Sequence, residues 1–169
     1  MTARKPLPVL ALALLFCLTL AAPALALFDK ELENEKLVMN FHGEVKRGGY
    51  QVVDTAGLKK WLDEKKPMLV VDTMPLEDSY KKQHIPGALQ FELPIPEMNE
   101  MPAERQAQLA KLLGPDKDRL IVMYCGFPKC TRSHNGAMWA VKLGYKNVFR
   151  YPGGIKAWAE AGHAVAKAE

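Results

Sequence analysis

The sequence is poor in cysteine, and its cysteines are confined to two places. Cys17 lies near the N-terminus, and the other two, Cys125 and Cys130, lie five positions apart. A small domain held together by disulfide bonds spreads its cysteines along the chain, so this chain does not belong to that class. The pair at 125 and 130 instead indicates one local piece of chemistry.

The sequence also lacks an excess of charge of either sign. It contains 23 Lys and Arg residues against 19 Asp and Glu residues. Two of the basic residues, Arg4 and Lys5, belong to an N-terminal segment that we expect to be removed, which leaves 21 against 19 and a net charge of +2. Such near neutrality gives no support for a nucleic-acid partner. Internal repeats and low-complexity tracts are absent from the sequence as well.

Long apolar runs are missing from the sequence except at the N-terminus. There Arg4 and Lys5 precede the apolar run 9–22, which is followed by Ala24-Leu25-Ala26. A basic start, a short apolar core and small residues at the cleavage positions are typical of a secretory signal peptide. We therefore expect residues 1–26 to be a signal peptide cleaved after Ala26, and the protein to be exported, periplasmic or secreted, with no membrane attachment after signal removal. A retained N-terminal anchor is the alternative.

The 143 residues after position 26 are enough for one domain with its own core. We expect an N-terminal helical extension at 27–47 and a single domain at 48–169. Strands are predicted at 50–53, 68–72, 89–93, 120–124 and 147–151, and helices at 56–64, 75–82, 103–113, 133–143 and 155–161. This alternation predicts an α/β fold with a parallel sheet that is covered on both faces.

The chemistry is concentrated in the stretch 120–133, which reads LIVMYCGFPKCTRS. Its first five residues form an apolar run of the kind expected for a buried parallel strand, and Cys125 follows at once. A helical pattern opens at Arg132-Ser133. Open α/β sheets bind anions between a strand's carboxyl end and a helix N-terminus, where N–H groups and the helix dipole also stabilise a thiolate. The sequence therefore predicts a reactive thiol in this loop.

Five short motifs, taken in order, resemble those of single-domain rhodaneses, which are sulfurtransferase-type domains. They are Val70-Val71-Asp72, His84-Ile85-Pro86-Gly87-Ala88, Tyr124-Cys125 with Arg132-Ser133, Gly144-Tyr145 with Val148, and Gly153-Gly154 with Trp158. The resemblance covers about residues 48–166. It implies a rhodanese-like α/β fold, with a five-stranded parallel sheet flanked by helices on both faces, in agreement with the alternation of strands and helices.

The cysteine loop departs from the family's pattern. The usual loop reads Cys-x-x-Gly-x-Arg, whereas Cys125 to Arg132 spans eight residues here and contains Cys130 as well. Phosphatase and arsenate-reductase relatives have a loop of intermediate length. In addition, Thr73-Met74 follows Asp72, where family members commonly carry Arg at the second position. Because loop length helps to set which anion fits, the resemblance leaves the specificity open.

The resemblance implies a sulfurtransferase that moves sulfane sulfur from thiosulfate or polysulfide to a thiol or cyanide acceptor through a cysteine persulfide. It places the nucleophile at Cys125, with inward N–H groups to stabilise the anionic persulfide. The residues implied to bind the donor are Gly126, Phe127, Lys129, Thr131, Arg132 and Ser133. Lys129 and Arg132 are suited to attract an anion, and Arg132 is also suited to brace the loop carbonyls. The implied partners are a small anionic sulfur donor and a thiol acceptor that another exported protein could supply; no cofactor is expected.

Three roles are open for Cys130. It is a second thiol that takes the sulfur from Cys125 or forms a disulfide with it, the nucleophile itself, or a bystander packed as a small apolar group. A metal site made of the two cysteines and His134 lacks a fourth ligand, so no metal is expected. The alternatives to sulfur transfer are a sulfur-carrier or binding module without turnover, and a two-cysteine thiol–disulfide or oxyanion-reducing enzyme.

Three further polar residues have expected roles that do not require contact with substrate. Asp72 either orients the active loop or caps the turn after its strand, and His84 is expected to fix the turn that follows it. His134 lies in the first turn of the predicted helix, where a solvent-facing side chain is expected.

Overall fold

The computed structural model describes residues 30–168, so the predicted signal peptide at 1–26 lies outside the described part of the chain. The residues described before Met39 form the first half of helix α2 (Glu31–Gly48), and a compact unit begins at Met39. The predicted extension thus contains a helix. The predicted boundaries at 27–47 and 48–169 stay a prediction.

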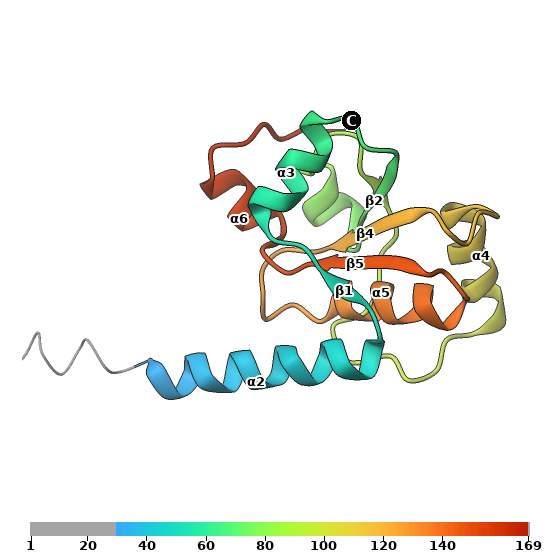
Figure 1. The fold of residues 1–169 in the computed structure, drawn as a ribbon, viewed down its shortest axis with the longest axis horizontal. Coiled ribbons are helices and arrows are strands. Elements are labelled where there is room, and N and C mark those ends of the chain that lie inside the picture. The colour runs from blue at the N-terminus through green and yellow to red at the C-terminus, as the bar shows by residue number, and fades with distance from the viewer. Residues whose placement is uncertain (1–29, 169) are drawn as a thin grey trace, which may run out of the picture. The chain divides into compact units, whose positions relative to one another are not determined.

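The compact unit alternates strands and helices along most of its length (Figure 1). After α2 the elements are β1 (Gln51–Val52), α3 (Thr55–Asp63), β2 (Met68–Asp72), the π-helical turn η1 (Leu76–Tyr80), β3 (Leu89–Gln90), α4 (Ala103–Leu113), β4 (Leu120–Tyr124), α5 (Arg132–Lys142), β5 (Asn147–Tyr151) and α6 (Gly154–Glu160). None of the helices in residues 30–168 is long and apolar enough to cross a membrane.

The five strands form one sheet in the order β1-β5-β4-β2-β3, and every pair in it is parallel. This confirms the predicted fold class. Strands β2, β4 and β5 occupy the predicted residues, whereas β1 and β3 are shorter than predicted. The two short strands lie at the edges of the sheet, where a strand has a neighbour on one side only. The predicted helix at 75–82 is a single π-helical turn, and Pro75 lies immediately before it.

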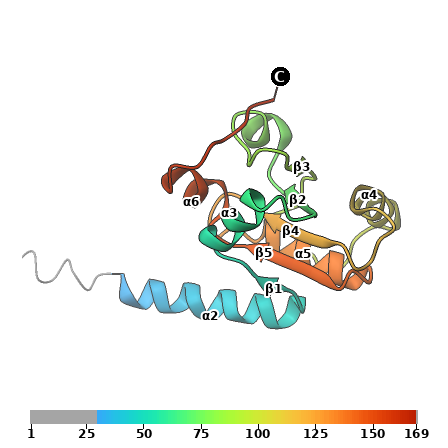
Figure 2. The ribbon, with the colours of Figure 1, turned by 45° about the horizontal axis from the view of Figure 1, so that its top comes forward.

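Alternate residues of each strand point to opposite faces of the sheet and build two cores. Figure 2 shows α4 and α5 on one side of the sheet and α3 and α6 on the other. The α5 side buries Val71, Met123 and Val148, and the α6 side buries Val70, Val122 and Tyr151. Strand β4 lies between β5 and β2, so its carboxyl end, where Cys125 follows, is held on both sides.

Candidate active site

The cysteine loop runs from β4 to the first residue of α5, as predicted. Within it the N–H of Cys130 donates to the carbonyl of Phe127 at 3.0 Å, which closes a tight turn with Pro128 at its second position. Proline is favoured there because its ring fixes φ near the value that this turn needs. This turn places both cysteines inside the same short loop.

Cys125 lies beneath the loop, and its side chain is fully buried. Its Sγ is 3.1 Å from the carbonyl oxygen of Cys130, 3.1 Å from Ser133 Oγ and 3.9 Å from the carbonyl oxygen of Phe127. The sequence leads us to expect N–H groups around this sulfur. The N–H of Ser133 is there, but two carbonyl oxygens face the sulfur as well. Burial raises the pKa of the Cys125 thiol well above its usual value, so Cys125 is held as a neutral thiol.

Cys130 has the opposite electrostatic environment. A hydrogen bond from the Cys125 thiol, the backbone N–H groups of Arg132 and Gly126 and the charge of Arg132 together lower the pKa of Cys130 to about 6, although burial opposes this. Its side chain is 7% exposed, whereas that of Cys125 is 0% exposed. Of the two cysteines, Cys130 has the environment that favours a thiolate, and the Cys125 thiol lies 3.1 Å from the carbonyl oxygen of Cys130.

The N-terminus of α6 orients the first residues of the loop. The N–H of Ile155 donates to the carbonyl of Cys125 at 2.9 Å, and the N–H of Lys156 donates to that of Gly126 at 3.1 Å. In a trans peptide the N–H points opposite to the C=O. Because the Cys125 carbonyl faces α6, the N–H of Gly126 faces away from α6, and this is the N–H that reaches the Cys130 sulfur.

Gly154 makes this contact between α6 and the loop possible. Its φ is +62°, and a Cβ on it would lie 2.3 Å from the carbonyl oxygen of Cys125. A side chain at this position would therefore suffer both backbone strain and a clash with the loop. By contrast, a Cβ on Gly126 would make only ordinary contact with Met74, at 3.5 Å.

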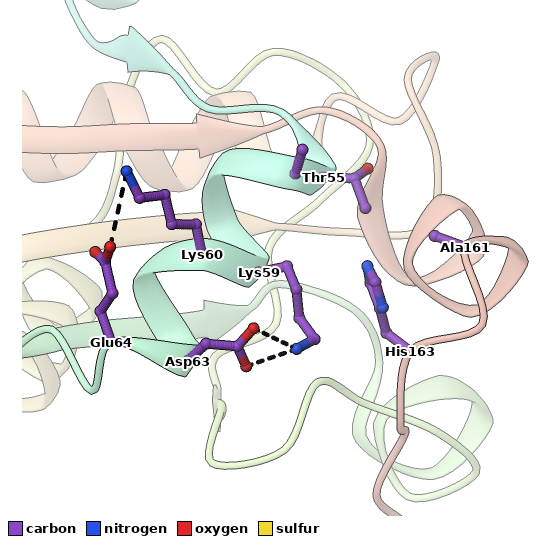
Figure 3. A pocket seen from close by; sticks show the side chains of 8 residues that line it. Thr55, Lys59, Lys60, Asp63, Glu64, Ala161 and His163 are labelled. Carbon is purple, nitrogen blue, oxygen red and sulfur yellow. Dashed lines mark hydrogen bonds and ion pairs between the residues drawn. The ribbon is translucent and has the colours of Figure 1, made fainter.

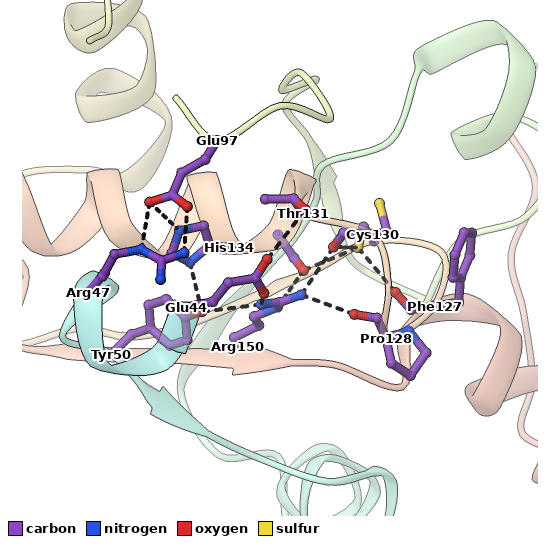
Figure 4. A network of polar contacts seen from close by, with 12 residues as sticks. Glu44, Arg47, Tyr50, Glu97, Phe127, Pro128, Cys130, Thr131, His134 and Arg150 are labelled. Atoms are coloured by element: carbon purple, nitrogen blue, oxygen red, sulfur yellow. Dashed lines mark hydrogen bonds and ion pairs between the residues drawn. The ribbon is translucent and has the colours of Figure 1, made fainter. Parts of the chain in front are cut away.

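A buried arginine on β5 holds the other half of the loop (Figure 4). Arg150 donates through Nη2 to the carbonyls of Cys130 at 3.1 Å and Pro128 at 3.5 Å, and through Nε to Ser133 Oγ at 2.9 Å. Its Nη1 donates to Tyr50 at 3.2 Å and forms an ion pair with Glu44 of α2. The carbonyls of Pro128 and Cys130 thus accept from a guanidinium, and the Cys130 carbonyl also accepts from the Cys125 thiol.

The predicted donor-binding residues come together in the loop but differ in their contacts. Phe127 and Lys129 are exposed, and Lys156 lies over the Phe127 ring at 4.6 Å. Thr131 Oγ1 donates to Glu44 at 3.3 Å. Arg132 donates to the carbonyl of Leu93 and lies 3.5 Å from Glu92, so its side chain braces the segment after β3 rather than the loop carbonyls.

His134 is not exposed to solvent, so the expectation of a solvent-facing side chain is wrong. Its side chain is 0% exposed, and Nδ1 lies 2.9 Å from the Tyr50 hydroxyl. Because that hydroxyl accepts from Arg150, it donates to Nδ1, which leaves the proton on Nε2, 3.5 Å from Glu97. Burial lowers the pKa of His134, which favours the neutral ring. The segment before α4 covers this first helical turn, since the N–H of Met98 donates to the neighbouring Asn135 side chain.

Asp72 and His84 have local contacts. Asp72 Oδ1 accepts from the N–H of Met74 at 2.8 Å, which is the turn-capping role, and burial raises the pKa of the Asp72 carboxyl. His84 Nδ1 lies 2.8 Å from the carbonyl of Tyr80, and its ring stacks on that of Tyr80. Its backbone pairs with Ala166. These contacts attach His84 to Tyr80 and to Ala166, and its expected role in fixing the turn that follows it stays a prediction.

The sequence reasoning missed Arg150, Tyr50 and Glu44. A signal for Arg150 was present, because it is the one charged residue in the run Asn147–Tyr151 and alternates with Val148 toward the α5 side. A cation at an inward position of a strand needs partners. Tyr50 and Glu44 carried no comparable signal, since they lie far from the loop in sequence.

A separate cavity of 670 Å³ lies between α3 and the segment after α6 (Figure 3). Its lysines, Lys59 and Lys60, pair with Asp63 and Glu64 one turn further along α3. None of the predicted site residues lines it. Within residues 30–168, no group of three or more His, Cys, Asp or Glu side chains is arranged to hold a metal ion.

The fold and the cysteine loop define a rhodanese-like protein. The family model described as the rhodanese-like domain matches residues 54–161, so the chain belongs to this family. A search of curated proteins gives no match.

Solved structures share the fold. The chain is similar to the BH2092 protein from Bacillus halodurans, with 24% identity, a TM-score of 0.54, and coverage of 76% of this chain and 85% of that one. It is also similar to a thiosulfate sulfurtransferase from Pseudomonas aeruginosa, with 18% identity, a TM-score of 0.58, and coverage of 76% and 23%. A protein from Rhodopseudomonas palustris described as a possible tyrosine phosphatase has 18% identity, a TM-score of 0.56, and coverage of 75% and 93%. At these identities the likeness shows the fold alone.

Proposed function

We propose that this protein is an exported sulfurtransferase in which Cys130 carries the transferred sulfur as a persulfide. The observation that carries the proposal is the environment of Cys130, where two backbone N–H groups, the Cys125 thiol and Arg132 surround a sulfur with a lowered pKa. The rhodanese-like fold supports sulfur transfer over other thiolate chemistry. Cys130 is the alternative nucleophile of the sequence analysis, and its environment makes it the better one.

In the first step the Cys130 thiolate attacks the outer sulfur of thiosulfate or of a polysulfide. A bond forms between Cys130 Sγ and that sulfur, and the donor's S–S bond breaks. The leaving group, sulfite in the case of thiosulfate, takes the electron pair of the broken bond. The N–H groups of Gly126 and Arg132 stabilise the anion on Cys130 before the attack and on the persulfide after it.

In the second step a thiolate or cyanide acceptor attacks the outer sulfur of the persulfide. The acceptor–sulfur bond forms, the bond to Sγ breaks, and Cys130 leaves as a thiolate. Its lowered pKa makes Cys130 a good leaving group as well as a ready nucleophile. The hydrogen bond from Cys125 compensates the negative charge that returns to Cys130 in this step.

Cys125 is the partner thiol in this scheme rather than the nucleophile. Its sulfur is fully buried and has carbonyl oxygens of the loop beside it, which disfavour a negative charge at that point. A donor could reach it only after the turn from Phe127 to Cys130 opened. A two-cysteine thiol–disulfide enzyme is the second candidate function, because the two thiols lie in one short loop and each affects the pKa of the other.

The proposed partners follow from this chemistry. The donor is a small sulfur-containing anion, and the acceptor is a small thiol, cyanide or a thiol on another exported protein. Lys129 is exposed beside Cys130 and is positioned to attract an anionic donor. We place the reaction in the periplasm or outside the cell, after cleavage near Ala26.

Persulfide formation tests the proposal. Reduced protein lacking residues 1–26 is incubated with thiosulfate or polysulfide, and its intact mass is measured. We expect an increase of about 32 Da, one sulfur atom, in the wild type and in Cys125→Ser, and no increase in Cys130→Ser. Addition of cyanide should then remove the extra mass.

The control variants distinguish the competing functions. If no variant gains mass while all are folded and reduced, sulfur transfer is refuted. If the wild type and Cys130→Ser gain mass and Cys125→Ser does not, Cys125 is the carrier and our assignment of the nucleophile is wrong. If the wild type instead loses about 2 Da on treatment with an oxidised dithiol partner and never gains sulfur, the two-cysteine oxidoreductase is the correct reading.

A further inference from the structure

The cysteine loop is connected to a helix that lies outside the matched family region. The family model begins at residue 54, whereas the last two turns of α2 include Phe41 and Glu44. Glu44 pairs with Arg150, and the Phe41 ring lies 5.0 Å from the Arg150 guanidinium. Both contacts are within the compact unit that begins at Met39.

Glu44 contacts the loop by two routes. One carboxylate oxygen pairs with Arg150, which in turn donates to the carbonyls of Pro128 and Cys130. The other accepts from the hydroxyl of Thr131 at 3.3 Å. The Glu44 side chain is 14% exposed, and that of Arg150 is 0% exposed, so little solvent competes for either charge. The two routes reach the loop on either side of Cys130, at the Pro128 carbonyl before it and at Thr131 after it.

Arg150 cannot hold the loop without a counter-ion. A buried guanidinium is costly unless an anion neutralises it, and Glu44 is the carboxylate with which it pairs among the described residues. The remaining hydrogen bonds of Arg150, to Tyr50, Ser133 and the two loop carbonyls, are to neutral groups. Removing the charge of Glu44 therefore weakens the hold on the loop carbonyls as well.

We propose that Glu44 is a positioning residue for the reactive cysteine, acting through Arg150 and Thr131, so that the last turns of α2 form part of the active site. This inference rests on Cys130 being the reactive thiol. It adds that residues before the family region contribute, together with α6, to the loop conformation that presents N–H groups to that sulfur.

The positioning role and a direct effect of the Glu44 charge predict opposite changes in the Cys130 pKa when Glu44 is replaced by Gln. Loss of a nearby negative charge, by itself, makes a thiolate easier to form and lowers the Cys130 pKa. Loss of loop positioning removes N–H groups from the sulfur and raises the pKa. The Arg132 guanidinium, whose charge also acts on Cys130, is unchanged by the substitution.

The experiment measures the pH dependence of alkylation of Cys130 by iodoacetamide, in protein that lacks residues 1–26 and carries Cys125→Ser, so that Cys130 is the single thiol. We expect Glu44→Gln to raise the midpoint by about 0.5–1 pH unit, a threefold to tenfold shift in the thiol–thiolate equilibrium. Glu44→Asp keeps the charge and should give an alkylation midpoint between that of Glu44→Gln and that of the parent protein with Glu44. Glu35→Gln, at an exposed position of the same helix, should leave the midpoint unchanged.

A second measurement tests directly whether the loop keeps its conformation. Native trypsin cleavage after Lys129, which lies in the turn, should become several-fold faster in Glu44→Gln and not in Glu35→Gln. An unchanged or lower alkylation midpoint in Glu44→Gln would overturn the proposal, and so would unchanged cleavage. Both readouts are independent of sulfur transfer, so they stand even if the enzyme activity is disproved. If Glu44→Gln does not fold, the alkylation midpoint and the cleavage rate are compared in Glu44→Asp and Thr131→Val instead.

Discussion

Replacing Cys125 by Ala should raise the pKa of Cys130. In the structure the hydrogen bond from the Cys125 thiol is the largest influence that lowers the Cys130 pKa to about 6. Alanine removes this donor and leaves the N–H groups of Arg132 and Gly126 in place. Serine at the same position keeps a hydroxyl donor and is the matched control.

The size of the effect follows from the strength of one hydrogen bond to a charged group. Such a bond contributes about 1.5–3 kcal/mol, and one pKa unit corresponds to about 1.4 kcal/mol, so the pKa should rise by about 1–2 units. Starting from about 6, a rise of about 1.5 units lowers the thiolate fraction at pH 7 from about nine-tenths to about one quarter. Cys125→Ser should stay within about half a unit of the wild type.

The assay is the full pH profile of Cys130 alkylation in the two single-thiol variants. A rate at one pH would mislead, because the intrinsic nucleophilicity of a thiolate rises by about 0.4–0.5 log units for each unit of pKa. For a rise of about 1.5 units that gain would offset the whole loss of thiolate at pH 7, whereas the midpoint of the profile is unaffected. Equal midpoints in Cys125→Ala and Cys125→Ser, or a lower midpoint in Cys125→Ala, would refute the assigned hydrogen bond.

Two other predictions concern stability. Gly154→Ala combines a left-handed backbone with a Cβ placed 2.3 Å from the Cys125 carbonyl, so we expect a loss of about 2–5 kcal/mol in urea unfolding. Gly144→Ala, also at positive φ but with open space around it, should lose only about 1–2 kcal/mol; equal losses would contradict the close contact. His134 has a lowered pKa in the folded state, so its contribution to stability is complete above the unfolded value near 6.5 and is lost as the pH falls toward the folded pKa. His134→Gln, which can still accept from Tyr50, should therefore reduce the loss of stability between pH 7.5 and 5.5; a loss equal to that of the wild type would show that another group is responsible.

The strands and helices around the site were predictable because local signals mark them. The apolar run before Cys125 gave β4 its bounds, and α4 was found at the residues that its leucines and the Gly114 stop indicate. The parallel pairing of the strands follows from the alternation of strands and helices, which the chain shows along most of its length. These features depend on residues close together in sequence.

The environment of the two thiols was not predictable from the same signals. It depends on contacts that are remote in sequence, such as the N–H of Ile155 on the Cys125 carbonyl and Arg150 on the Cys130 carbonyl. The burial of His134 has the same origin, because a first-turn position is exposed unless another segment covers it, and here Tyr50 and the segment around Met98 do so. Arg150, a charged residue at an inward position of β5, was the one sequence signal for these remote contacts.

The central claim, that Cys130 carries the sulfur, is tested most directly by locating the added sulfur in the wild-type protein. Trypsin cleavage after Arg119, Lys129 and Arg132 separates the two thiols into the fragments 120–129 and 130–132. Protein treated with thiosulfate is alkylated before digestion to fix the persulfide. We predict the additional sulfur, about 32 Da, on the fragment 130–132. Its appearance on the fragment 120–129 alone would contradict the account.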